Sequence, residues 1–293
     1  MKKILMTLAA VLCCAITASA QDAQADRNKT YNIILGNVQY THHDEKMSTG
    51  EAIGKVLTGV LTGQTSVQVT KYEADVQAAI IKGLSSAYRF RYNDALQIGD
   101  LAEEGNIVAD VIITNIEAKS STSTWKDTKG KTQVSTTYTG VCEAMLSLKD
   151  AKTSEVVTNT AFKGQGTTTS SFSDADKAIR DALDKLTKRI TVWLNNYRPL
   201  QANIIEGSTA KKDKQKEVYI DLGSNEGAHA GLQMGVYVIK NIAGREAKSQ
   251  IGKLKIEAVE GDDISLCKVQ SGGKDIKAAL DAGQQLRVVS IDK

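Results

Sequence analysis

The side chains with metal-ligand chemistry stand together at one place in this sequence, His42-His43-Asp44-Glu45. Imidazole nitrogens and carboxylate oxygens are common ligands of zinc. Adjacent residues of a strand or helix point in different directions, however, so four consecutive side chains rarely share one ion. The third histidine, His229, is remote in the sequence. We therefore predict that residues 42–45 form a loop and that the chain has no metal site.

The sequence also contains no clear motif for a catalytic nucleophile or for a phosphate-binding loop. The chain has no G-x-S-x-G sequence, the pattern that places a serine on a sharp strand-to-helix turn. Gly130-Lys131-Thr132 matches the last three residues of the phosphate-binding loop motif, but Trp125 occupies the position of the motif's first glycine. Dispersed Asp and Glu residues could still form a carboxylate pair in the folded chain. The sequence predicts a non-catalytic protein without a cofactor, and a hydrolase with dispersed carboxylates is the alternative.

The amino terminus is organised like a secretory signal peptide. Lys2 and Lys3 precede an apolar run from Ile4 to Ile16, which is followed by Ala18-Ser19-Ala20. The run is shorter than the roughly 20 residues of a membrane-spanning helix, and small residues at its exit favour cleavage. We predict a signal peptide at 1–20, export to the periplasm or to the periphery of the outer membrane, and no integral membrane span in the mature chain.

The four cysteines fall into two pairs. Cys13 and Cys14 lie within the signal segment, and the residues before them lack the small side chain that precedes a lipidated cysteine. Cys142 and Cys267 remain in the mature chain, each within an apolar strand pattern. They are typical of small buried residues, and a disulfide between them is disfavoured because they fall in different predicted domains.

The charge of the chain is nearly balanced, with 37 basic and 34 acidic residues. A nucleic-acid-binding protein concentrates its positive charge on one face. The lysines at 211–216 are interrupted by Asp213 and followed by Glu217, so we interpret 207–217 as a solvated loop. No nucleic-acid partner is predicted.

Apolar periodicity predicts an α/β domain over residues 21–199. A helix is expected from Thr70, where Glu73 completes a capping box, and another from the capping box Ser173 and Asp176. The second helix has one apolar stripe: Ile179, Leu183, Leu186, Ile190 and Trp193. Runs of apolar residues predict the strands Tyr31–Tyr40, Tyr88–Tyr92, Ile107–Ile116, Val141–Leu148 and Glu155–Lys163. This order indicates an α/β sandwich, a mostly antiparallel sheet with two main helices.

A small all-β barrel is predicted for residues 200–293. Pro199 ends the preceding helical pattern, and the rhythm then changes to short strands. Six are expected: Leu200–Ile205, Val218–Leu222, Gly235–Lys240, Ile251–Val259, Ile264–Val269 and Leu286–Ile291. Gly223, Gly227 and Gly231 are interpreted as turn residues with positive φ. The whole chain is therefore predicted to be α+β.

Two polar segments interrupt the first domain, Ser120–Trp125 and Thr132–Thr139. Both are rich in Ser and Thr, and only Trp125, Val134 and Tyr138 offer apolar surface. A membrane-spanning strand alternates apolar and polar residues over about 9 to 11 positions. We therefore predict exposed β-arms rather than membrane strands.

Several motifs resemble two known families. The ADVIITNIEA segment from Ala109 and the LSLKDAKTSEVV segment from Leu146 resemble the curli production assembly/transport (CsgG-like) family. The segments VYIDLGSNEG from Val218 and GVYV from Gly235 are similar to the C-terminal domain of the flagellar assembly protein T (FlgT) family. The resemblance implies a diderm cell envelope and a ring-like or dimeric assembly. The chain departs from channel-forming CsgG-like members because it lacks a lipidated cysteine and clear membrane-spanning hairpins.

One apolar stripe is not required by this fold pattern. Within Ser48–Gly63 it comprises Ile53, Val56, Leu57, Val60 and Leu61, with glycines interspersed. Such a helix would pack on its own sheet, form a subunit contact in a homo-oligomer, or lie on a membrane surface. The segment has one lysine and no Trp anchor, so the subunit contact is preferred to the membrane surface. We retain it as the predicted interaction surface.

These patterns predict an interaction protein rather than an enzyme. The α/β domain would oligomerise or dock, and the barrel would bind a protein partner of the cell envelope. The expected role is an accessory or structural component of an envelope assembly or secretion system of the curli or flagellar type. An activator that docks on a cell-wall synthase is a second possibility from the same fold.

Overall fold

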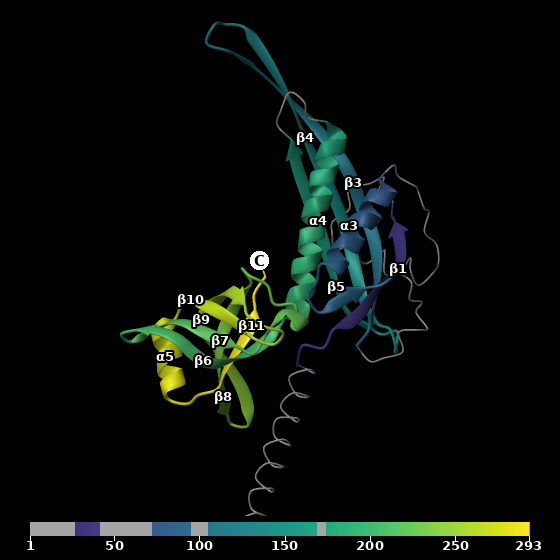
Figure 1. Cartoon of the computed structure of the whole chain (residues 1–293). Coiled ribbons are helices and arrows are strands. Elements are labelled where there is room, and N and C mark those ends of the chain that lie inside the picture. Colours follow the sequence, from purple (N-terminus) through teal and green to yellow (C-terminus); the bar gives the residue numbers. More distant parts are fainter. Residues whose placement is uncertain (1–26, 42–71, 95–104, 169–173, 293) are drawn as a thin grey trace, which may run out of the picture. The chain divides into compact units, whose positions relative to one another are not determined.

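The chain is α+β, with a mixed sheet beside helices and a closed β-barrel, as predicted (Figure 1). The structure, a computed structural model, describes residues 27–41, 72–94, 105–168 and 174–292. These residues form two compact units, one from Tyr31 to Leu194 and one that combines 27–30 with the segment from Asn195 onward. The predicted signal peptide at 1–20 lies outside the described residues.

Five strands form the sheet of the first unit in the order β2-β1-β3-β4-β5. Their bounds are Tyr31–Tyr40 for β1, Phe90–Tyr92 for β2, Ile107–Lys126 for β3, Thr132–Asp150 for β4 and Val156–Thr168 for β5. β1 pairs in parallel with β2 and β3, whereas the longer β3–β4 and β4–β5 pairings are antiparallel. β3, β4 and β5 are longer than predicted because their polar ends continue the ladder.

Two helices cover one face of this sheet, α3 (Glu73–Ser85) and α4 (Ala175–Tyr197). The predicted stripe of α4 is correct, since Ile179, Leu183, Leu186 and Ile190 are buried. Trp193 is half-buried and contacts the Phe162 ring edge-on, with 5.4 Å between centroids. The stripe on α4 therefore faces the sheet, as its spacing predicts.

Glycines allow α4 to approach the sheet closely. A Cβ atom at Gly140 or Gly166 would overlap the carbonyl oxygen of Ala178, and one at Gly164 would overlap that of Ala182. These overlaps involve helix backbone, which cannot move aside as a flexible side chain can. The absence of side chains at these positions on β4 and β5 thus sets the distance between helix and sheet.

The two helices are joined by hydrogen bonds as well as packing. Thr187 Oγ donates to the Ala79 carbonyl at 2.9 Å, and Thr191 Oγ donates to the Gly83 carbonyl at 3.0 Å. Buried hydroxyl groups need such partners, because an unpaired one costs free energy. These two threonines of α4 therefore fix its position against α3.

The helix starts differ from the predicted capping boxes. Asp174 caps α4, because its carboxylate accepts the Lys177 N–H at 2.5 Å. Ser173 and Thr70 lie outside the described residues. At the start of α3, Tyr72 occupies the N-cap position and makes no side-chain cap.

The second unit is a closed six-stranded barrel of order β10-β7-β6-β11-β8-β9. Its strands are β6 Gln201–Lys211, β7 Lys214–Ile220, β8 Gln233–Ile242, β9 Arg245–Val259, β10 Ser265–Ser271 and β11 Leu286–Ser290. All six predicted strands are present. Alternate residues fill the interior, among them Val218, Ile220, Val236, Leu254 and Val288, which are fully buried.

Two local predictions for the barrel are wrong, and one helix was not predicted. The expected lysine-rich loop is the β6–β7 hairpin, with its turn at Lys212-Asp213. Gly223 has an extended backbone with φ −130°, and a side chain there would overlap the backbone of Asp262. Gly227 and Gly231 do have the predicted positive φ, +92° and +96°. A helix that was not predicted, α5 (Gly273–Asp281), follows β10 and buries Ile276 and Ala279.

Two residues before the first strand belong to the barrel unit, and we call them the N-terminal clasp: Arg27 and Asn28. The Arg27 guanidinium bonds both carboxylate oxygens of Asp221 at 3.0 and 3.1 Å and the Asp221 carbonyl at 3.0 Å. Asn28 accepts the Gln201 N–H at 2.8 Å and donates to the Gln201 carbonyl at 2.7 Å. Asn28 also donates to Glu226 at 2.9 Å. The barrel unit is thus built from two segments that are distant in the sequence.

Cys142 and Cys267 are free and fully buried, one in each unit. Burial raises the pKa of each thiol from 9.0 to about 12. A thiol with such a pKa carries almost no thiolate at neutral pH, and the thiolate is the nucleophilic form. Both residues therefore act as small apolar side chains, as predicted.

Candidate functional site

The predicted interaction surface, Ile53, Val56, Leu57, Val60 and Leu61, lies outside the described residues, as does the cluster 42–45. His229 is described; it is exposed, and its Nδ1 is 3.2 Å from the Gly227 carbonyl. In the ranges that the structure describes, no three residues of metal-ligand type come close enough to hold an ion. None of the described helices has the length and apolar character needed to cross a membrane.

The most prominent exposed feature of the first unit is the long β3–β4 hairpin, and we call its outer part, residues 121–137, the arm. In Figure 1 it projects past the end of α4. β4 pairs with β5 only as far as Tyr138, and β3 pairs with β1 only as far as Ile113. Within the described part of the chain, the two arm strands pair with each other alone, from Ser121↔Thr137 to Lys126↔Thr132. Among the described residues, therefore, no third strand pairs with either edge of the arm.

The tip of the arm is a well-ordered turn built around Asp127. One carboxylate oxygen accepts the N–H groups of Lys129 and Lys131, both at 2.9 Å, and the other accepts Gln133 Nε2 at 3.0 Å. Gly130 has φ +75°, which a side chain would disfavour. The Gly130-Lys131-Thr132 sequence thus serves a turn, and the amides that a phosphate loop would offer are used by the protein itself.

The hydrogen bonds that Asp127 accepts at the arm tip are expected to weaken in acid. The hydrogen bond from Gln133, followed by those from Lys131 and Lys129, lowers the pKa of Asp127 below its ordinary value of 3.8. A lowered pKa means that the carboxylate stabilises the turn above 3.8 and loses this effect as the pH falls through the folded-state pKa. The amide NMR signals of Lys129 and Lys131 should shift with a midpoint below pH 3.8. Asp127→Asn should abolish that titration, and a midpoint above 3.8 would contradict the turn geometry.

The strands of the arm present apolar side chains on both faces. Trp125 is opposite Gln133, and Val134 is opposite Thr124, the neighbouring pair, so Trp125 and Val134 point to opposite faces. Trp125 is 50% exposed and Val134 63% exposed. Two pairs farther from the tip than Val134 lies the hydroxyl pair Thr122–Thr136, whose oxygens are 3.2 Å apart. The arm can therefore offer backbone edges, hydroxyl groups and two apolar anchors to a partner.

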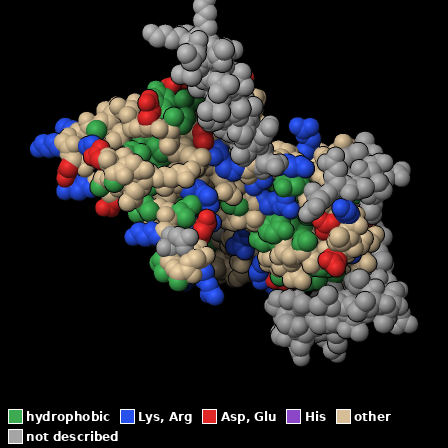
Figure 2. Space-filling model, turned by 90° about the horizontal axis from the view of Figure 1, so that it is seen from below, with side chains coloured by type: hydrophobic (Ala, Val, Ile, Leu, Met, Phe, Trp, Pro, Cys, Tyr) green, Lys and Arg blue, Asp and Glu red, His purple; other side chains and the backbone are tan. Residues whose placement is uncertain are grey.

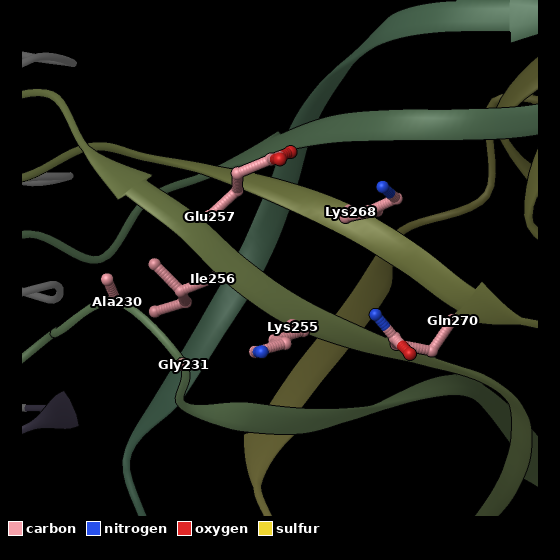
Figure 3. A pocket seen from close by; sticks show the side chains of 7 residues that line it. All are labelled: Ala230, Gly231, Lys255, Ile256, Glu257, Lys268 and Gln270. Carbon is pink, nitrogen blue, oxygen red and sulfur yellow. The ribbon is translucent and has the colours of Figure 1, made fainter.

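A second exposed feature is a groove of about 690 Å³ on the wall of the barrel (Figure 3). Lys255, Ile256 and Glu257 come from β9, and Lys268 and Gln270 from β10. The loop before β8 closes one side, where Gly231 N–H donates to the Ile256 carbonyl at 2.8 Å. Figure 2 shows that Lys and Arg side chains on the visible face lie among acidic and hydrophobic ones.

The described carboxylates with a shifted pKa are all more acidic than usual. A hydrogen bond from Lys119 lowers the pKa of Glu117, one from Thr153 lowers that of Asp150, and one from Lys274 lowers that of Asp213. Asp150 accepts the N–H groups of Lys152 and Thr153 at 2.9 and 3.0 Å, so its role is to form the β4–β5 turn. A general acid at neutral pH needs a raised pKa instead. These three carboxylates and that of Asp127 therefore have structural roles.

Sequence reasoning identified the arm but missed the groove. The Ser/Thr-rich composition predicted β-arms at 120–125 and 132–139, and both segments are strands in the structure. The groove depends on which residues of β9 and β10 lie opposite each other. That register shifts between Leu266 and Cys267 and between Val269 and Ser271. No sequence pattern predicts these shifts.

Comparisons with known proteins do not assign this chain to a family. No known protein family and no curated protein matches it. Among solved structures, a DUF330-family protein from Xanthomonas campestris is 9% identical, with TM-score 0.32 over 58% of this chain and 84% of that one. A hypothetical protein from Chlamydia trachomatis is 8% identical, with TM-score 0.29 over 57% and 95%. A lipoprotein from Neisseria meningitidis is 13% identical, with TM-score 0.21 over 57% and 99%. These scores are too low to carry an argument about function.

Proposed function

We propose that this chain is a non-catalytic, exported protein of the cell envelope that acts through protein–protein contacts, and that the arm makes the principal contact. The observation that carries the proposal is the geometry of residues 121–137: a two-stranded ribbon that no other described strand pairs with, and on which Trp125 and Val134 are exposed. Export is supported by the signal-peptide pattern at residues 1–20.

The physical argument concerns the stability of an isolated ribbon. Two strands without a third strand or a packed face are marginally stable in water at best. An open strand edge also presents unpaired N–H and C=O groups to any other chain. A partner that adds a strand to one edge would satisfy those groups and cover one apolar anchor. The partner would then supply the tertiary contacts that the arm lacks among the described residues.

The family resemblances narrow the proposal. The sequence motifs of the first domain resemble the CsgG-like family, and those of the barrel resemble the C-terminal domain of the FlgT family. We infer an accessory or structural role in an envelope assembly or secretion system, with another copy of the chain or a different envelope protein on the arm. An activator that docks on a cell-wall synthase would use the same surface.

Affinity capture from intact envelopes tests this function. Tagged mature protein should retain an abundant partner in a fixed ratio to itself, and mass spectrometry would identify it. A cell-wall synthase among the captured proteins would favour the activator role. The absence of any stoichiometric partner, together with hydrolytic activity of the purified chain, would favour the hydrolase instead.

A further inference from the structure

Two lysines occupy directly opposed positions on neighbouring strands of the barrel. Lys268 on β10 lies directly opposite Lys255 on β9 in the antiparallel register. Like charges in directly opposed positions destabilise a sheet. Neither ammonium group forms an ion pair with any residue that the structure describes. The pair therefore has a repulsion that a bound anion would relieve.

The neighbours of the pair do not neutralise it. On the β8 side, Lys255 lies opposite Gln233, which is uncharged. On the β7 side, Lys268 lies opposite Glu217, yet no ion pair joins these two side chains. Lys253 is two residues before Lys255 and is also exposed on the outer face of β9. The groove thus has a surplus of positive charge beside a hydrogen-bonding amide, that of Gln270.

The negative charge of Glu257 limits the kinds of anion that the groove can bind. It is the next outward residue of β9 after Lys255, so the exposed row reads Lys253, Lys255, Glu257. Outward residues on one strand are about 6.6 Å apart, the same spacing as alternate side chains of an extended peptide. A uniformly anionic surface such as a lipid bilayer would be repelled by Glu257. A peptide can place acidic residues at the lysines and a neutral or basic residue at Glu257.

We propose that this groove binds an acidic, extended peptide segment of a protein partner, with one carboxylate held between Lys255 and Lys268 (Figure 3). The groove offers room for such a segment above β9 and β10, and the Ala230–Gly231 loop borders it. The side chain of Gln270 lies at the groove and can donate to a peptide carbonyl. This inference rests on the proposed function only in taking the ligand to be a protein.

The test uses the whole mature protein and a labelled synthetic peptide Asp-Ser-Asp-Ser-Asn, which places acidic residues at two successive outward positions and a neutral residue at the third, for Glu257. The control peptide alternates Asn with Ser. At low salt the Asp peptide should bind about tenfold more tightly, and salt should reduce the difference because it screens exposed charges. Lys255→Gln and Lys268→Gln should each weaken binding of the Asp peptide by about three- to tenfold, the range expected for part-exposed charge-assisted contacts.

Lys248→Gln is the matched control, since Lys248 is an exposed lysine of the same strand outside the groove. It should change the affinity by less than about twofold. Melting temperatures separate binding from structure: removing one of two opposed lysines should leave the temperature unchanged or raise it. A purely structural role of the pair would lower it.

Three outcomes would overturn the proposal: equal binding of the Asp and Asn peptides, unchanged binding by both groove variants, or binding only to phosphatidylglycerol vesicles. The arm is untouched in every one of these variants. A negative peptide experiment therefore does not count against the role of the arm. A negative capture experiment on the arm likewise does not count against peptide binding in the groove.

Discussion

Arg27→Met is expected to lower the free energy of unfolding of the barrel unit by about 3 kcal/mol, because it leaves the part-buried Asp221 carboxylate without its counter-charge. The two side chains are 17% and 20% exposed, so solvent can replace only part of the lost interaction. Asp221 would keep its bonds from the Asn203 backbone and side chain, which limits the loss. Urea denaturation of the full mature chain, followed by a probe in the barrel, measures the effect.

Arg245→Met is the control for this prediction. Arg245 is an exposed arginine at the start of β9 in the same unit, and its replacement should change the free energy of unfolding by no more than about 0.5 kcal/mol. If Arg27→Met were as mild as this control, the clasp would be a surface contact rather than a part of the barrel unit.

Shortening the arm is expected to abolish partner capture while leaving the fold intact. Ser120 and Tyr138 lie directly opposite each other, so an Asn-Gly turn can join them in place of residues 121–137. The deleted residues pair only with one another among the described residues, and the melting temperature should change little. The amount of captured partner should fall by at least about tenfold, as expected when the anchors at the centre of an interface are lost.

Thr128→Asn is the control for the arm deletion. It alters the exposed turn without removing either strand or the carboxylate of Asp127. Capture should remain at the level of the unchanged protein. Full capture by the shortened chain would show that the partner binds elsewhere, and the predicted surface at 53–61 or the barrel groove would then become the leading candidates.

The strands and main helices were predictable because their sequence patterns are local. The stripe from Ile179 to Ile190 has the spacing of one helix face, and all six barrel strands alternate or run apolar between turn residues. Helix α5 was missed because it is short, starts beside Gly272-Gly273 and buries only Ile276 and Ala279. Two buried residues do not establish a helical period, so the segment that begins at Ser271-Gly272-Gly273 was interpreted as a turn.

The contacts that define the clasp and the groove are non-local. Arg27 and Asp221 are 194 residues apart in the sequence, and nothing near Arg27 indicates its partner. The Lys255–Lys268 opposition requires the exact register of an irregular strand pair. The arm is the intermediate case: its polar composition predicted exposure, but strands with two polar faces do not specify register from their pattern. Pairing there follows from the turn at Asp127.

Site-specific photo-cross-linking in growing cells tests most directly the claim that the arm contacts a protein partner. A photo-reactive amino acid would replace Val134 on the arm or, as the reference position, Glu246, which is exposed on the barrel. We expect a discrete covalent adduct with another protein chain at position 134 and a much weaker one at 246. No adduct at 134, or equal adducts at both positions, would contradict the proposed role of the arm.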